Sequence, residues 1–246
     1  MEKEIDKPFL TIVIPAYNEE RRLGTTLEAI AAYLSRQSYS ASVLVVDDGS
    51  ADRTVQVVKD FAAAHPELAL SVLSTTHRGK GHAVKTGMLA TTSTYRFLCD
   101  ADLSMPIEEL SKFLPPQRNH FDIAIGSREA PGAKRYGEPR HRHIMGRVFN
   151  LIVRLVAVRG LADTQCGFKC FHERAAEALF PLQQMDGWAF DVEILFLAQQ
   201  RHFKIVEVPI DWYHVANSKI SPIGDTFRMF RGALAVRWNG WKGLYR

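Results

Sequence analysis

The sequence has few cysteines and no long apolar run, and each of these absences excludes a class of protein. Its three cysteines, Cys99, Cys166 and Cys170, are odd in number and form no CxxC pair. Neither a disulfide scaffold nor a zinc site is therefore expected, and a reducing compartment fits. No stretch of about 18 apolar residues is present, so no membrane-spanning helix is expected. Residues 1–8 lack the apolar segment of a secretory signal.

Blocks of like charge and nucleic-acid-binding signatures are also missing. The net charge is only +4, and the basic residues are scattered along the chain. This mild excess suits phosphate ligands or an anionic membrane surface, and nucleic acid is not an expected partner. With 246 residues, 46% of them hydrophobic, the chain can bury one substantial core.

The sequence does contain a regular alternation of apolar strands with helical patterns. A helix is expected after each of the first three strands. The first runs from Asn18 to about Ser35, the second extends through Phe61, and the third follows Gly81. Two more helices are expected at Met145–Val158 and Trp188–Gln200. Pro209 favours an edge position for the last strand. Strands are expected at Phe9–Ile14, Val43–Val46, Leu70–Leu73, Tyr95–Leu98, Phe121–Gly126 and Ile205–Ile210. This pattern predicts an α/β fold whose mostly parallel sheet carries helices on both faces.

The C-terminal stretch differs from the rest of the chain. We expect one domain over residues 1–220 and an amphipathic helical segment over residues 221–246. Basic residues accompany aromatic and apolar residues that recur there at helical spacing, namely Phe227, Phe230, Leu234, Trp238, Trp241 and Tyr245. This composition favours a helix lying on an anionic membrane. The alternative is a helix packed on the domain or on a second subunit, which would make a homo-oligomer.

Acidic residues follow three of the expected strands. They occur at Asn18-Glu19, at Asp47-Asp48-Gly49-Ser50 and at Asp100-Ala101-Asp102. Asp100 and Asp102 are two residues apart, so their side chains can project to one side where the chain leaves the sheet. Such paired carboxylates suit Mg²⁺ or Mn²⁺ that takes phosphate oxygens as further ligands. Each run could also be only a turn or a helix cap.

A flexible basic segment, Arg78-Gly79-Lys80-Gly81, follows the third strand. It offers a cation for phosphate, but the spacing of a P-loop is absent. No GxGxxG follows the first strand either, which disfavours a nicotinamide cofactor.

Taken in order, these motifs resemble the inverting family-2 glycosyltransferases of the GT-A fold. The matching residues are Ile14-Pro15-Ala16-Tyr17-Asn18-Glu19, Val46-Asp47-Asp48-Gly49-Ser50, Gly79-Lys80-Gly81 and Asp100-Ala101-Asp102. Further motifs look like those of dolichyl-phosphate β-glucosyltransferases and their prokaryotic polyprenyl-phosphate relatives. These are Gly126-Ser127-Arg128, Asp163–Lys169, Trp188–Glu193 and Ser218-Lys219.

The resemblance implies roles for individual positions. Asp102 would be the more direct metal ligand, with Asp100 beside it, and Arg128 and Arg142 would hold the acceptor phosphate. Asp48 would read the base, and Lys80 would lie near the nucleotide. The nucleotide-sugar site would comprise Pro15, Ala16, Tyr17, Glu19, Asp48, Lys80, Asp100, Ala101 and Asp102.

The charge of the acceptor determines which catalytic groups are needed. A phosphate monoester is mostly dianionic at pH 7 because its second pKa is about 6, so it can attack without a general base. It needs cations instead, and arginine binds phosphate through two parallel hydrogen bonds. Arg128 and Arg142 are the candidates, although each could be a surface ion-pair partner. Asp163, Asp191 and Glu193 could orient the sugar or these cations. For Asp191 and Glu193, the alternative is a structural role on the helix expected at Trp188–Gln200.

The expected function is transfer of glucose from UDP-glucose to a dolichyl or polyprenyl phosphate, with Asp100, Asp102 and Arg128 as catalytic residues. The expected location is the cytoplasmic face of a membrane, as a peripheral protein. One alternative is mannosyl transfer from GDP-mannose. A sugar-phosphate nucleotidyltransferase would need a Gly-rich basic loop after the first strand, where this chain has Pro15–Glu20. A non-catalytic membrane-binding module is disfavoured by the intact carboxylates.

Overall fold

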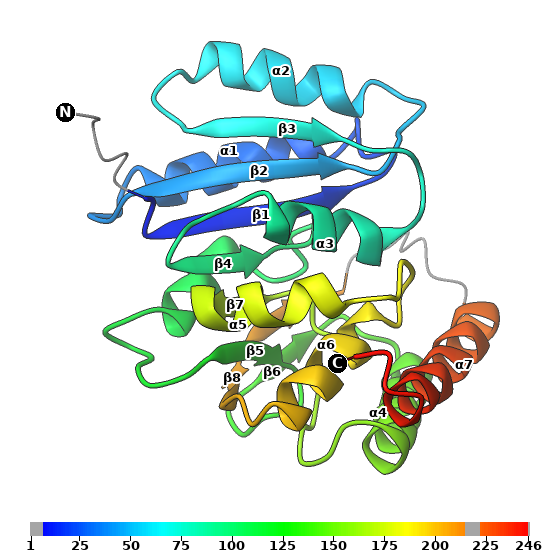
Figure 1. Cartoon of the computed structure of the whole chain (residues 1–246). Coiled ribbons are helices and arrows are strands. Elements are labelled where there is room, and N and C mark those ends of the chain that lie inside the picture. The colour runs from blue at the N-terminus through cyan, green and yellow to red at the C-terminus, as the bar shows by residue number, and fades with distance from the viewer. Residues whose placement is uncertain (1–6, 215–221, 246) are drawn as a thin grey trace.

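The computed structural model describes residues 7–214 and 222–245, which form a mixed sheet flanked by helices (Figure 1). Seven strands lie in the order β3-β2-β1-β4-β7-β5-β8, and β6 and β9 form a separate parallel pair. The strands are β1 (Leu10–Ala16), β2 (Ala41–Asp47), β3 (Leu70–Ser74), β4 (Tyr95–Leu98), β5 (Ile123–Ser127), β6 (Lys134–Tyr136), β7 (Lys169–His172), β8 (Ile205–Pro209) and β9 (Asp211–Tyr213). The prediction of a mostly parallel α/β sheet is confirmed.

Helices cover both faces of the large sheet, as the alternation of strands and helices predicts. They are α1 (Leu23–Leu34), α2 (Thr54–Ala64), α3 (Lys80–Leu89), α4 (Arg140–Val156), α5 (Glu173–Leu179), α6 (Phe190–Gln200) and α7 (Pro222–Trp241), with 3₁₀ turns at Ile107–Phe113 and Phe180–Leu182. In β1, Ile12 and Ile14 pack towards α1, while Val13 packs towards α3 on the opposite face. This alternation follows from the two-residue period of a strand.

Several elements of the second half differ from the sequence-based prediction, because β6, β7, β9 and α5 were not expected. The structure adds β7, a strand antiparallel to both β4 and β5, which lies between them. It also begins α4 at Arg140, ahead of Met145, where the sequence predicts the start of this helix. The edge position expected from Pro209 is confirmed, because among the strands of the described residues β8 pairs with β5 alone.

The carboxyl ends of the parallel strands meet at one edge of the sheet, and the functional motifs follow them there. Loops after β1, β2, β4 and β5 carry Glu19, Asp48, Asp100 and Arg128. Because β7 runs in the opposite direction, its first residue, Lys169, arrives at the same edge opposite Leu98. Open α/β sheets bind ligands at such an edge.

The C-terminal helix α7 packs on the domain through one face. Ala233 and Val236 are fully buried, and α7 contacts α4 and α6. Figure 1 shows α7 lying beside α4 at one end of the molecule. The expectation that Tyr245 belongs to an exposed aromatic face is wrong. The helix ends at Trp241, and Gly243, with φ at +71°, turns the chain back so that Tyr245 is buried.

Candidate active site

Two cavities lie next to each other at the carboxyl edge of the sheet. The first has a volume of about 450 Å³ and the second about 250 Å³. Four residues line both of them, namely Lys80, Asp100, Asp102 and Trp188. We call the first the donor cavity and the second the acceptor cavity, and the four shared residues the junction.

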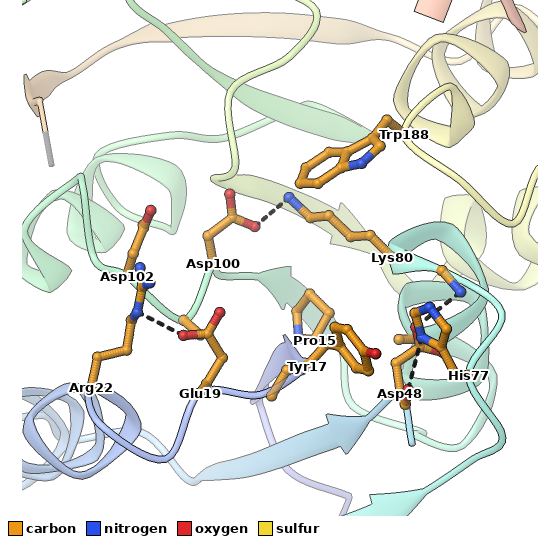
Figure 2. A pocket seen from close by; sticks show the side chains of 14 residues that line it. Pro15, Tyr17, Glu19, Arg22, Asp48, His77, Lys80, Asp100, Asp102 and Trp188 are labelled. Atoms are coloured by element: carbon orange, nitrogen blue, oxygen red, sulfur yellow. Dashed lines mark hydrogen bonds and ion pairs between the residues drawn. The ribbon is translucent and has the colours of Figure 1, made fainter. Parts of the chain in front are cut away.

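The donor cavity brings together all the positions assigned to a nucleotide sugar. Its lining includes Pro15, Ala16, Tyr17, Glu19, Asp48, Lys80, Asp100, Ala101 and Asp102. It also contains residues that the sequence analysis did not select, Arg22 and His77 among them. Figure 2 shows these side chains around the cavity. His77 directly precedes the Arg78-Gly79-Lys80-Gly81 motif, and this proximity is the one signal that could have identified it.

The loop after β1 is fixed by the end of β2. The Asn18 N–H donates to Ser50 Oγ at 2.8 Å, and Asn18 Oδ1 accepts from the Ala51 N–H at 2.9 Å. Asn18 itself has a left-handed backbone, with φ at +52°. For this reason α1 begins at Leu23 rather than at Asn18, and Tyr17 and Glu19 are left in a loop that faces the cavity.

Asp48 holds the next wall of the donor cavity in place. Its carboxylate accepts from the backbone N–H of Arg78 at 3.0 Å and of Gly79 at 2.9 Å. The same group lies 2.8 Å from His77 Nδ1, and the His77 ring stacks on Tyr17 with centroids 4.1 Å apart. Asp48 therefore organises the segment before α3, and reading of a base by Asp48 stays a prediction.

The junction carries the two carboxylates of the DxD motif. Figure 2 shows Asp100 and Asp102 pointing the same way, as the two-residue spacing predicts. Asp100 Oδ1 lies 2.6 Å from Lys80 Nζ, and Asp102 Oδ1 accepts from the Ser104 N–H at 3.0 Å. Burial alone lowers the pKa of Lys80, but attraction to Asp100 and Asp191 outweighs it and raises the pKa overall. Lys80 therefore stays a cation at the junction.

Two further residues shape the junction. The Trp188 ring lies over Lys80 Nζ, 5.1 Å from the ammonium to the ring centroid. Gly167 packs against Asp100 so closely that a Cβ at this position would collide with the carboxylate. A side chain at Gly167 would therefore require the Asp100 carboxylate to move from its present position.

The acceptor cavity contains Arg128, and binding of the acceptor phosphate by this residue stays a prediction. Its Nε and Nη2 donate to the two oxygens of Asp163, at 2.7 and 2.9 Å. Burial raises the pKa of Asp163, but Arg128 more than compensates and lowers it to about 2. Asp163 is fully buried, whereas the Arg128 side chain is 20% exposed, so this pair aims a fixed guanidinium at the cavity.

A second buried ion pair lies on the other side of the acceptor cavity. Lys169 Nζ is 2.5 Å from Asp191 Oδ1, and these side chains are 2% and 5% exposed. Burial raises the pKa of Asp191, and Lys169 and Lys80 oppose that rise. Glu193, by contrast, lies outside both cavity linings and accepts from the backbone N–H groups of Gln184 and Met185 and from Tyr245. Its role is structural, one of the two interpretations that the sequence left open.

Arg142 was the other acceptor-phosphate candidate. Its side chain, like all of Ser218 and Lys219, lies outside the part of the chain that the structure describes. Arg135 lines the acceptor cavity and was not predicted. Glu129 and Glu138 pair with its guanidinium at 2.6 and 2.5 Å, an arrangement that ties β6 to its neighbouring loops.

The carboxylates at the junction fit a magnesium-type ion that keeps some of its water ligands. Over residues 7–214 and 222–245, no cluster of three or more His, Cys, Asp or Glu side chains forms a protein-only metal cage. Asp100 and Asp102 could supply carboxylate oxygens, and water and phosphate oxygens would complete an octahedral shell. In the donor cavity the carboxylates outnumber the Lys and Arg side chains, so an anionic diphosphate there would need an added cation.

Comparisons with known proteins agree with this geometry. Residues 11–180 match the model of "Glycosyl transferase family 2". Dolichyl-phosphate β-glucosyltransferases from Dictyostelium discoideum and Homo sapiens are 32% and 30% identical to this chain. The first alignment covers 98% of this chain and 78% of the relative, and the second covers 96% and 77%.

Solved structures match the fold. Glucosyl-3-phosphoglycerate synthase from Mycobacterium tuberculosis in complex with UDP superposes with a TM-score of 0.68 at 18% identity, covering 94% of this chain and 80% of that one. The same enzyme with Mn²⁺ and UDP-glucose gives a TM-score of 0.63 at 18% identity, with 96% and 79% covered. The fold is therefore of the GT-A type, and this chain belongs to glycosyltransferase family 2.

Proposed function

We propose that this protein transfers glucose from UDP-glucose to a dolichyl or polyprenyl phosphate, with inversion at the anomeric carbon. The observation that carries the proposal is the junction. The DxD carboxylates lie between a cavity lined by the nucleotide-sugar motifs and a cavity that contains a fixed arginine. A donor diphosphate and an acceptor phosphate could thus face one another across the sugar.

The donor would bind along the loops after β1, β2 and β4. Tyr17 and Asp48 would flank the nucleoside, and Lys80 would exchange its contact with Asp100 for an oxygen of the diphosphate. Asp100 and Asp102 would hold Mg²⁺ or Mn²⁺. When bound, the ion neutralises charge that develops on the departing diphosphate.

The acceptor would bind at Arg128. The phosphate oxygen attacks the anomeric carbon from the face opposite UDP, a new carbon–oxygen bond forms, and the bond to UDP breaks with both electrons leaving on UDP. Because the phosphate arrives ionised, no residue has to remove a proton. Arg128, held by Asp163, would position this dianion and offset its repulsion from the donor. Arg142 is proposed as a second arginine that binds the acceptor phosphate.

The choice of glucose rests on the relatives. The matched relatives from Dictyostelium discoideum and Homo sapiens are named dolichyl-phosphate β-glucosyltransferases. The bacterial structure of similar fold was solved with Mn²⁺ and UDP-glucose. These names support UDP-glucose as the donor for this chain, and GDP-mannose is the alternative.

The decisive experiment supplies each labelled nucleotide sugar separately. The protein is incubated with polyprenyl phosphate, Mn²⁺ and either UDP-[¹⁴C]glucose or GDP-[¹⁴C]mannose, and the label in the lipid phase is counted. We expect label from UDP-glucose alone and a β-anomer by NMR. Label from GDP-mannose alone would make the proposed donor wrong. Release of pyrophosphate from a nucleoside triphosphate would instead indicate a nucleotidyltransferase.

We also propose that the protein works at the cytoplasmic surface of an anionic membrane. Within the described residues, no helix is both long and apolar enough to cross a bilayer. Yet α4 and α7 expose large apolar side chains next to each other, with Arg147, Arg154, Arg231 and Lys242 exposed around them. These side chains are Val148, Leu151, Leu155, Leu234, Trp238 and Trp241. Such a mixture suits the interface of an anionic lipid surface.

The two helices that carry this surface also border the acceptor cavity, since Gly146 and Asn150 of α4 and Met229 of α7 contribute to its wall. A lipid chain could then stay in the membrane while its phosphate enters the cavity. We expect co-sedimentation with vesicles rich in phosphatidylglycerol, weaker binding to phosphatidylcholine, and partial release by salt. Equal recovery in the supernatant with both vesicle types would contradict the membrane proposal.

A further inference from the structure

Asp191 has features that neither the metal site nor the acceptor phosphate explains. It lies in the first turn of α6, its side chain is 5% exposed, and it still lines the acceptor cavity. The start of a helix favours a negative charge, and the Lys169 ammonium neutralises the charge of Asp191. Among the described residues Asp191 has one ion-pair partner, Lys169, which contacts Oδ1.

Lys169 is built to hold this carboxylate in one position. It projects from β7, which is hydrogen-bonded on both sides in the middle of the sheet, and its ammonium also donates to the Cys166 carbonyl at 2.5 Å. Burying two charges costs desolvation energy, so a buried pair is weak evidence for stability alone. The pair fixes a carboxylate whose second oxygen, Oδ2, can serve a ligand in the cavity.

Asp191 lies close to the place that the transferred sugar would occupy. The sugar must lie between the diphosphate at Asp100 and Asp102 and the phosphate at Arg128, which is the junction. Trp188, three residues before Asp191, is 37% exposed there and lines both cavities. An aromatic ring offers a surface for the C–H face of a hexose, and a carboxylate accepts hydrogen bonds from its hydroxyls.

We propose that Asp191, held by Lys169, accepts hydrogen bonds from ring hydroxyls of the transferred hexose and thereby selects the sugar. This inference rests on the proposed function. A site built to pair with a hydroxyl discriminates strongly against a sugar that lacks it, because the buried partner is then left without a hydrogen bond. Asp191 is thus a specificity-determining residue, and Lys169 is a positioning residue that acts through it.

The test compares UDP with UDP-glucose. Calorimetry with Mn²⁺ present measures both affinities for the wild type and for Asp191→Asn. We expect UDP binding to stay within twofold, while UDP-glucose binding weakens about ten- to a hundredfold, the usual effect of losing a hydrogen bond to a charged group. Lys169→Met should produce a smaller loss in the same direction. Asp122→Asn is the matched control, a buried aspartate paired with Arg174 outside both cavity linings.

A second measurement uses UDP-glucose analogues that lack one hydroxyl each. For the wild type, we expect at least one deoxy analogue to lose about tenfold or more in kcat/KM. For Asp191→Asn, that penalty should disappear, because the hydroxyl no longer has a partner to lose. Equal weakening of UDP and UDP-glucose, or a deoxy penalty that persists in the variant, would overturn the inference.

These outcomes remain separate from the proposed function. If GDP-mannose proved to be the donor, the same comparison would be made between GDP and GDP-mannose, and the role of Asp191 would be judged on that pair. If UDP-glucose is transferred to the lipid and Asp191→Asn changes neither affinity ratio nor deoxy penalty, the proposed function stands and the inference fails.

Discussion

The donor and acceptor cavities are built in opposite ways. The donor cavity takes nearly all of its lining from residues before 103, in loops that follow successive parallel strands, and only Trp188 comes from later in the chain. The acceptor cavity combines the segment 100–105 and Arg128, which follow β4 and β5, with residues of β6, β9, α4, α6, α7 and the segment 165–167, which are far apart in sequence. The first is a local product of the strand order, and the second depends on the complete tertiary structure.

The two cavities also differ in how their charges are held. In the acceptor cavity, Arg128 and Asp191 each have a partner that is at most 2% exposed. At the junction, Lys80 and Asp100 are 17% and 27% exposed, and within the described residues each forms an ion pair only with the other. The acceptor cavity is thus preorganised, whereas the junction can exchange its internal pair for a diphosphate and its metal ion.

The largest effect is expected from a change in the donor cavity. Asp102→Ala removes the proposed metal ligand, and we expect kcat/KM to fall about a thousandfold, since such an ion supplies several kcal/mol of charge stabilisation. The melting temperature should change little, because Asp102 makes one recorded hydrogen bond within its own turn. Asp60→Ala, on the exposed side of α2, is the control. Unchanged turnover in the Asp102 variant would refute the metal role.

A smaller loss is expected on the acceptor side. Arg128→Lys keeps the positive charge beside Asp163 but removes the planar fork that can bind Asp163 and phosphate together. We expect kcat/KM for polyprenyl phosphate to fall about a hundredfold while UDP affinity stays constant. Arg174→Lys, in an ion pair outside both cavity linings, should leave both values unchanged. Loss of UDP affinity in the Arg128 variant would show that the cavities do not separate donor from acceptor.

The donor cavity could be predicted from the sequence more fully than the acceptor cavity, because its residues follow recognisable strands. Strand ends can be recognised from apolar runs, so the sequence alone predicts that Glu19, Asp48 and Asp100 lie at one edge of the sheet. The inner strand β7 could not be predicted in this way. The segment Lys169–His172 is only four residues long and buried on both faces, so it has no alternation to detect.

The ion-pair partners of the residues in the acceptor cavity could not be predicted from the sequence either. Sequence analysis selected Arg128 and Asp163 but could not pair them, because they are 35 residues apart and meet through the packing of a loop against β5. Helix α4 was predicted to start at Met145 because Pro139 and Gly137 indicate a loop, but the proline in fact precedes the first turn. Short antiparallel insertions and long-range ion pairs depend on tertiary contacts that a single sequence does not encode locally.

The next prediction concerns stability rather than turnover. The pKa of Asp163 is lowered from 3.8 to about 2 in the folded protein, so its ion pair stabilises the fold fully above pH 4 and progressively less as the pH falls towards 2. Asp163→Asn should lower the free energy of unfolding at pH 7 by about 3 kcal/mol. Urea titrations should show the gap to wild type narrowing between about pH 4 and pH 2. A gap that is constant across this range would contradict the pairing.

The smallest effect is expected at the surface beside the acceptor cavity. Trp238 and Trp241 are 54% and 72% exposed on α7, so changing both to alanine should weaken binding to anionic vesicles about tenfold without altering UDP affinity. The matched control changes Tyr136 and Tyr213, which are 39% and 45% exposed on the β6–β9 pair. If the two double variants lose vesicle affinity equally, exposed aromatic area alone explains the binding. A loss confined to the tryptophans would connect the membrane to the acceptor cavity, whose wall α7 helps to form.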